Sequence, residues 1–231
     1  MHEPDVMDAQ PRSSVLDLYL ASVARGELMP DEHQKSVVTK LQEISDRIGS
    51  TPHRILQKTA DKSGLRKLFS RKSSEVPQSI TPVAGLYVWG GVGRGKTHLV
   101  DLFFENLPGD QKMRLHFHRF MVLVHDELRK LGNISNPLEI VAENFAAKTR
   151  LLCLDEMHVH DITDAMLLGE LFKHLFRRGV TLVTTSNVEP KGLYHNGLQR
   201  QRFLPAIALL EQHTEVVHIG GDTDYRLRAL E

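Results

Sequence analysis

The stretch GLYVWGGVGRGKT, residues 85–97, carries the strongest structural signal in this chain. Within it, Gly90, Gly95, Lys96 and Thr97 fit the phosphate-loop pattern G-x-x-x-x-G-K-[ST]. Glycines let a strand turn sharply into a helix, so that successive backbone N–H groups point into one anion-binding cavity. The alternative is a structural glycine-rich turn, but such a turn has no reason to end in Lys-Thr. We therefore predict a strand, a nucleotide-binding loop and a helix.

The side chains of this loop have distinct expected roles. The Lys96 ammonium is expected to reach the outer phosphates and the Thr97 hydroxyl to ligate Mg²⁺, while the N-terminal end of the following helix adds positive partial charge. The residues expected to contact the nucleotide are Gly90, Gly91, Val92, Gly93, Arg94, Gly95, Lys96, Thr97 and His98. The loop alone predicts the binding of a nucleoside triphosphate.

The composition sets wider bounds. With 29 basic and 29 acidic residues, the global charge favours no nucleic-acid or acidic partner. The single cysteine, Cys153, fits a reducing compartment, and its apolar neighbours predict a buried strand position. No apolar run approaches the length of a membrane span, and the first residues lack an export signal. We expect a soluble protein whose membrane contact, if it has any, is peripheral.

Three segments are expected along the chain. Residues 1–13 are expected to be disordered, residues 14–80 to form N-terminal helices and a basic linker, and residues 81–231 to form the nucleotide-binding core. Two helices are predicted before the linker, one from Val15 to about Arg25 and one that follows Pro30 and Asp31 and ends at Gly49. The linker has six basic and two acidic residues between Lys58 and Gln78. Such a segment either binds acidic lipid or nucleic acid, or is a solvated loop.

Strands and helices alternate in the core. The predicted strands are 85–89, 113–118, 151–155 and 180–186, and the predicted helices between them are 97–107, 119–131 and 162–177. The strands read as short apolar runs. This pattern predicts an α/β fold with a parallel sheet covered by helices on both faces.

Hydrolysis requires an acid on the metal side and a group that activates water. The run LLCLDE, residues 151–156, ends a buried strand in Asp155, which can hold Mg²⁺, and Glu156, which can polarise the attacking water. Two acids after a strand are common by chance, but behind a phosphate loop they predict a hydrolysis site. Asn187, at the end of the next strand, is a candidate sensor of the terminal phosphate; alternatively, its side chain satisfies the loop backbone.

Two arginines precede the apolar helix that follows residue 203. If subunits pack head to tail, Arg202 or Arg200 can reach the terminal phosphate of a neighbouring subunit. Arg202 is preferred because Phe203 beside it would anchor the segment. The alternative is that each arginine pairs with an acid on a solvated face.

The motifs taken in order resemble those of the ZapE family, the bacterial cell-division AAA+ ATPases, which have mitochondrial AFG-type relatives. The segments that carry the resemblance are GLYVWGGVGRGKT, FHRFM, VHDEL, LDEMHV, DITDAM, RRGVTLVTTSNV, LYHNGLQRQRFLP and DYRLR. The resemblance as a whole covers nearly everything from about Val15 to the end of the chain. The phosphate loop is generic, whereas DITDAM, NGLQR and DYR in this order are far more specific.

The resemblance implies an AAA+ core with a parallel five-stranded sheet, Mg²⁺-dependent ATP hydrolysis and homo-oligomerisation with ATP. The implied roles fall on Lys96 and Thr97 in the loop, Asp155 and Glu156 on the magnesium and water side, Asn187 as sensor, and Arg200 or Arg202 as intersubunit finger. In the bacterial branch, which the chain resembles because it lacks a transit-like start, the implied role is cell division on the tubulin-like protein FtsZ. The implied location is the cytoplasm and the periphery of the inner membrane.

The end of the chain carries one further expectation. Family members continue past the DYR segment, so the helical lid over the nucleotide is expected to be missing after Glu231, with weaker nucleotide affinity and assembly.

Two other functions remain as alternatives. A nucleic-acid loader of the helicase-loader type would show salt-sensitive DNA binding through Lys62–Lys72, but the sequence has no base-reading helix-turn-helix. A small-molecule kinase would need an acceptor pocket and a lid arginine set, and Glu156 beside Asp155 favours activation of water instead. The ATPase is the leading hypothesis.

Overall fold

The computed structural model describes residues 14–28, 30–51 and 81–220. The expected disordered segment 1–13, the basic stretch from Lys58 to Gln78 and the DYR segment lie outside the described residues. None of the helices that the structure describes is both long and apolar enough to cross a membrane.

Five parallel strands form one sheet in the order β2-β3-β4-β1-β5. Their bounds are β1 Gly85–Trp89, β2 Lys112–His116, β3 Leu151–Asp155, β4 Thr181–Ser186 and β5 Thr214–His218. Because all strands are parallel, their carboxyl ends meet at one edge of the sheet. The predicted α/β fold with a parallel five-stranded sheet is confirmed.

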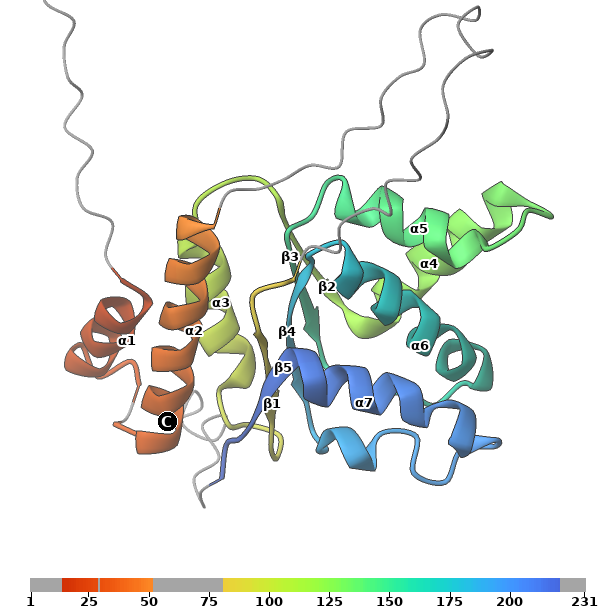
Figure 1. Ribbon diagram of the computed structural model, residues 1–231. Helices are drawn as coiled ribbons and strands as arrows, with labels where there is room; N and C mark the ends of the chain where they lie inside the picture. The colour runs from red at the N-terminus through yellow and green to blue at the C-terminus, as the bar shows by residue number, and fades with distance from the viewer. Residues whose placement is uncertain (1–13, 29, 52–80, 221–231) are drawn as a thin grey trace, which may run out of the picture.

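Helices cover both faces of the sheet (Figure 1). On one face lie α1 Val15–Ala24, α2 Glu32–Ser50 and α3 Lys96–Asn106. On the other lie α4 Phe117–Leu131, α5 Pro137–Ala146, α6 Ile162–Arg177 and α7 Leu204–His213. Two 3-10 turns, η1 Pro190–Gly192 and η2 Arg200–Arg202, precede α7.

The sheet separates two hydrophobic clusters. Along β3, Leu151 and Cys153 pack with the helices α1 to α3, whereas Leu152 and Leu154 pack with α4 to α7. This alternation follows from the two-residue period of a strand. Cys153 is fully buried, which confirms its predicted strand position, and burial raises the pKa of its thiol.

The two N-terminal helices pack against the nucleotide-binding core. Ser14 forms a capping box with Asp17 at the start of α1, and Asp31 caps α2. The buried face of α2, with Val37, Val38 and Leu41, shares a cluster with residues of α3. Both predicted helices are therefore present.

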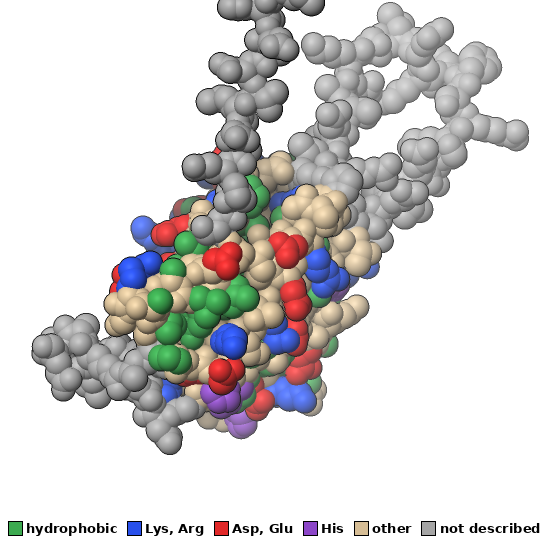
Figure 2. Space-filling model, turned by 90° about the vertical axis from the view of Figure 1, so that its left-hand side faces the viewer, with side chains coloured by type: hydrophobic (Ala, Val, Ile, Leu, Met, Phe, Trp, Pro, Cys, Tyr) green, Lys and Arg blue, Asp and Glu red, His purple; other side chains and the backbone are tan. Residues whose placement is uncertain are grey.

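The outer side of these helices keeps some apolar surface. Figure 2 looks onto the side of the molecule that carries α1 and α2, and hydrophobic side chains gather near the middle of this face. Leu20 of α1 is 46% exposed. The N-terminal helices thus bury one apolar side on the core and leave some apolar side chains exposed on the outside.

The sequence-based elements differ from the structure by one residue at several ends, and three differences are larger. The strand predicted at 113–118 ends at His116, because Phe117 begins α4 and its side chain is buried in the core. Helix α5 was not predicted, although Pro137 at its first turn is a typical start signal. Strand β5 was not located from its residues, since an exposed edge strand lacks the continuous apolar run of the central strands.

Candidate nucleotide-binding site

The phosphate loop connects β1 to α3 at the carboxyl edge of the sheet. Gly95, the residue before α3, is left-handed with φ +78°, and a Cβ there would lie 2.9 Å from Gln34 Nε2. A Cβ on Gly90 would lie 2.3 Å from the Ile219 carbonyl oxygen. No described side chain caps the start of α3, so its first N–H groups stay available for phosphate oxygens. The loop has the form that the sequence predicts.

Lys96 is the first residue of α3, directly after the loop, and is buried. Its Nζ donates to the carbonyl oxygens of Gly90 at 2.8 Å and Gly91 at 2.7 Å, and to Asn187 Oδ1 at 3.2 Å. Burial lowers the pKa of Lys96, the nearby Glu156 carboxylate opposes this shift, and Arg94 adds to it. The structure therefore brings the predicted lysine and the predicted sensor amide, 91 residues apart, into direct contact.

Asp155 ends β3 with a side chain that is 7% exposed. Its Oδ2 accepts from Arg114 Nε at 2.7 Å, but its Oδ1 is buried and has no hydrogen-bond partner among the described residues. A buried carboxylate oxygen without a partner is unfavourable unless a ligand completes it. Oxygen atoms are the ligands that Mg²⁺ prefers, and Thr97 adds a hydroxyl in the first turn of α3. These residues fit a magnesium ion.

Glu156 projects from the same edge and stays accessible, with 71% of its side chain exposed. Its backbone is left-handed, with φ +55°, and its N–H donates to Thr185 Oγ1 at 3.0 Å. His116 Nδ1 lies 3.8 Å from Glu156 Oε2. A strained backbone held by the neighbouring strand is common at functional sites. The geometry leaves this carboxylate free to accept a proton from water.

Arg114 of β2 was not a sequence candidate, yet it joins several parts of the site. Its guanidinium is 14% exposed and pairs with both Asp155 and Asp101. Burial lowers its pKa, but the hydrogen bonds and charges of Asp155 and then Asp101 outweigh this, so the pKa of Arg114 is raised. Its place in a predicted strand was the only signal in the sequence, and it was a weak one because β2 is a half-buried edge strand.

Gln34 of α2 is a second residue that sequence reasoning missed. It is fully buried, and its Nε2 donates to the Arg94 carbonyl oxygen at 3.1 Å. It also fills the space over Gly95 that a Cβ would need. A polar residue on the apolar face of α2, in register with Val37 and Leu41, was the available signal. Gln34 ties the N-terminal helices to the phosphate loop.

We expect Gln34→Leu to weaken nucleotide binding about fivefold, the effect of losing one net hydrogen bond to the loop. Leucine keeps similar bulk, and the substitution also removes the buried Oε1, which has no partner among the described residues, so little stability should be lost. Titration of a fluorescent ADP analogue and thermal unfolding measure the two effects. Gln42→Leu on the same helix is the control for affinity: its amide donates to Asp46 and accepts from the Val15 N–H at the start of α1, away from the loop, so this variant should lose stability but keep nucleotide affinity. Unchanged affinity in Gln34→Leu would contradict the role.

The two finger candidates lie in η2, after the loop that follows β4. Arg200 is half-buried, donates to the Lys191 carbonyl oxygen at 2.6 Å, and has a buried Nε without a partner among the described residues. Arg202 is exposed, and the Phe203 ring beside it is buried. In the described residues, no hydrogen bond or ion pair joins either arginine to the phosphate loop of its own chain. Among the described residues, neither arginine therefore belongs to the nucleotide site of its own chain.

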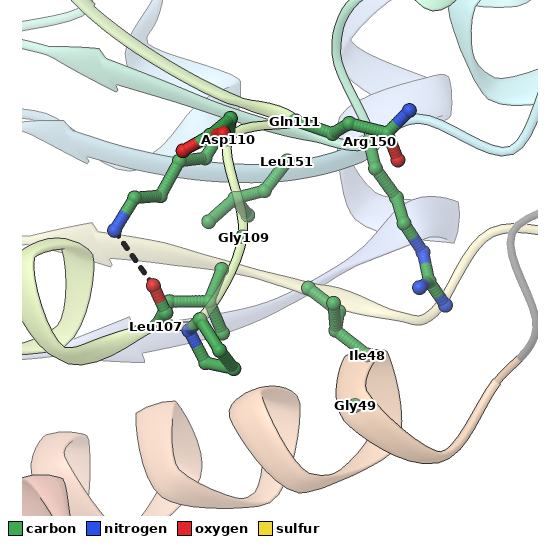
Figure 3. A pocket seen from close by; sticks show the side chains of 10 residues that line it. Ile48, Gly49, Leu107, Gly109, Asp110, Gln111, Arg150 and Leu151 are labelled. Carbon is green, nitrogen blue, oxygen red and sulfur yellow. Dashed lines mark hydrogen bonds between the residues drawn. The ribbon is translucent and has the colours of Figure 1, made fainter.

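A pocket of about 290 Å³ lies at the opposite edge of the sheet (Figure 3). Ile48 of α2, Leu107 after α3, and Arg150 and Leu151 at the start of β3 line it. Since Leu151 begins the strand that Asp155 ends, the pocket is separated from the nucleotide site by the length of the strand. None of the predicted site residues lines this pocket.

The five parallel strands in this order carry a phosphate loop after β1 and paired acids at the end of β3. These features define the fold and the nucleotide site of the P-loop proteins of the AAA+ class. The chain belongs to the AFG1-like ATPase family, whose sequence model matches residues 13–231. Membership implies nucleotide binding by the loop.

A curated protein with a similar sequence supports this family assignment. The chain is 52% identical over 217 residues to the cell division protein ZapE of Escherichia coli K12, covering 92% of this chain and 56% of that protein. The resemblance to the ZapE family is thereby confirmed, and the chain spans about half the length of this relative.

Solved structures show the shared fold. AMPPCP-bound DnaA from Aquifex aeolicus aligns with a TM-score of 0.54 at 17% identity, covering 89% of this chain and 52% of that one. DnaI aligns with a TM-score of 0.52 at 16% identity, and the alignment covers 94% of this chain and 95% of the DnaI chain.

Proposed function

We propose that this chain is the hydrolysing core of an AAA+ ATPase that assembles with copies of itself and remodels a protein partner in bacterial cell division. The observation that carries the proposal is the meeting of Lys96, Asn187 and the Glu156 carboxylate at one edge of the sheet. A loop that only bound nucleotide would need neither the amide nor the exposed acid. The similarity to a cell division protein over 92% of the chain supports the cellular role.

The residues of the site would act as follows. N–H groups at the start of α3 bind phosphate oxygens, and Lys96 exchanges its loop carbonyl partners for the outer phosphates. Glu156 takes a proton from the attacking water, while Asn187 holds that water or the terminal phosphate. Thr97 and Asp155 would hold a magnesium ion, which would neutralise part of the phosphate charge.

The proposal also names a protein partner and a cellular location. We take the partner to be the tubulin-like division protein FtsZ, and the location to be the cytoplasm with contact at the periphery of the inner membrane. The nucleic-acid loader is not proposed, because identities of 16–17% to DnaA and DnaI support the fold alone, and the basic segment lies outside the described residues.

The test uses the whole chain with purified FtsZ. We expect phosphate release from ATP that stops when EDTA removes Mg²⁺, and co-sedimentation of the chain with FtsZ polymers when ATP is present. Lys173→Ala, which removes an exposed lysine of α6 that pairs with Glu170, is a control for charge changes remote from the site. Absence of phosphate release would contradict the ATPase. Phosphate release without any FtsZ binding would retain the ATPase and exclude this partner.

A further inference from the structure

We propose that Arg114 is a positioning residue for magnesium: it fixes Asp155 so that one carboxylate oxygen is neutralised and the other is left for the metal. The proposal rests on the proposed function, since it concerns the metal side of the same nucleotide site. It assigns a role to a residue that the phosphate-loop pattern and the paired acids do not include.

The Arg114 guanidinium bridges three elements of the fold. From β2, its Nε donates to Asp155 Oδ2 on β3 at 2.7 Å, and its Nη1 donates to Asp101 on α3. Its Nη2 lies 3.3 Å from the carbonyl oxygen of Thr97, in the first turn of α3. A planar guanidinium presents these donors in a fixed fork, so the three acceptors constrain one another.

This arrangement gives the two carboxylate oxygens of Asp155 different environments. Arg114 occupies Oδ2, while Oδ1 is buried and has no partner among the described residues. A carboxylate with two free oxygens could rotate. With Oδ2 held, the rotation is restricted, and the oxygen that remains is the one available to a cation.

Asp101 fixes Arg114 from the other side. It lies on α3, the helix whose first turn carries Thr97, so Arg114 couples the strand of one expected ligand to the helix of the other. Two carboxylates and one guanidinium leave this cluster with a formal charge of −1, which still attracts Mg²⁺. Residues that orient metal ligands in this way typically affect metal affinity by roughly 10- to 100-fold.

The competing explanation is a structural link between β2 and α3, and the chain contains a matched control for it. Lys112, two residues earlier on β2, ties the same strand to the other end of α3 by donating to the carbonyl oxygens of Phe104 and Leu107. Lys112→Met therefore loosens the same pair of elements without touching Asp155.

The experiment measures how much MgCl₂ is needed for half-maximal binding of a fluorescent ADP analogue to the whole chain. Arg114→Lys keeps the charge but cannot form the fork, and it should raise that concentration roughly 10-fold or more. Binding of the analogue in EDTA should not change. Lys112→Met should lower the thermal midpoint while leaving the magnesium requirement at the wild-type value. Asp101→Asn should also raise the magnesium requirement, as Arg114→Lys does. Its side chain is partly exposed, so this second variant keeps the test valid if Arg114→Lys fails to fold.

The outcomes separate the two proposals. A wild-type magnesium requirement in Arg114→Lys, or an equal rise in Lys112→Met, would overturn the role of Arg114 and leave the ATPase standing. A wild-type chain that binds no nucleotide, or binds it without any response to MgCl₂, would overturn the proposed function and the role of Arg114 together.

Discussion

Replacing Glu156 by Gln should lower the rate of ATP hydrolysis about 10²- to 10⁴-fold and leave nucleotide affinity within about twofold of the wild type. Glutamine keeps the size of the side chain but cannot take a proton from the attacking water. The side chain is 71% exposed, and the backbone is held by Thr185, so the substitution should not disturb folding. Binding should persist because the contacts of Lys96 and of the loop are unchanged.

Single-turnover phosphate release measures the rate of the chemical step, and titration of a fluorescent ATP analogue measures affinity. Glu170→Gln, on the exposed side of α6, is the matched control and should behave as the wild type. Lys96→Ala should differ in kind, since it removes a group expected to contact phosphate and should lose binding as well as turnover. With ATP, the Glu156→Gln form should also retain FtsZ longer than the wild type does. A variant that keeps a tenth of the wild-type rate would remove Glu156 from the role of base.

The parts of the site that could be read from the sequence are those whose signal is local. The phosphate loop is a run of consecutive residues, and Asp155, Glu156 and Asn187 each follow a recognisable buried strand. Once the strands are known to be parallel, their carboxyl ends must meet at one edge. The structure does bring Asn187 to Lys96 at that edge.

The residues that were missed have partners far away in the sequence. Arg114 lies 41 residues from Asp155 and 13 from Asp101, and Gln34 lies 60 residues from Arg94. No spacing rule connects such positions, because the contacts depend on strand order and on how α2 packs. Their only local sign was a polar or charged side chain on an element that packs against the core: Gln34 lies on the apolar face of α2, and Arg114 lies in the half-buried strand β2. Such a side chain requires a partner, and the partner's identity comes only from the fold.

Arg202→Ala should lower turnover about 10³-fold or more, although Arg202 has no hydrogen bond or ion pair to the described site of its own chain. The reason is that negative charge on the phosphate oxygens in the transition state would be stabilised by this arginine from a neighbouring subunit. Arg202 is exposed and lies beside the buried Phe203 ring, which anchors the segment. Affinity for ADP, which lacks the terminal phosphate, should change little. Turnover per subunit of the wild type should rise with protein concentration, because only assembled subunits have complete sites.

Mixing two inactive variants tests the action between subunits directly. Lys96→Ala supplies an intact Arg202, and Arg202→Ala supplies an intact loop, so the mixture should recover activity that neither variant has alone. Arg200→Ala is the comparison, because its guanidinium already donates to the Lys191 carbonyl oxygen and should act mainly on the order of the segment, with a smaller loss of turnover. Arg177→Ala, at an exposed position of α6, controls for lost surface charge. An inactive mixture together with concentration-independent wild-type turnover would exclude a finger from the neighbouring subunit. If Arg200→Ala gave the larger loss of turnover, Arg200 and not Arg202 would be the finger. The half-buried Arg200 guanidinium would then have to leave the Lys191 carbonyl oxygen to reach the neighbouring subunit.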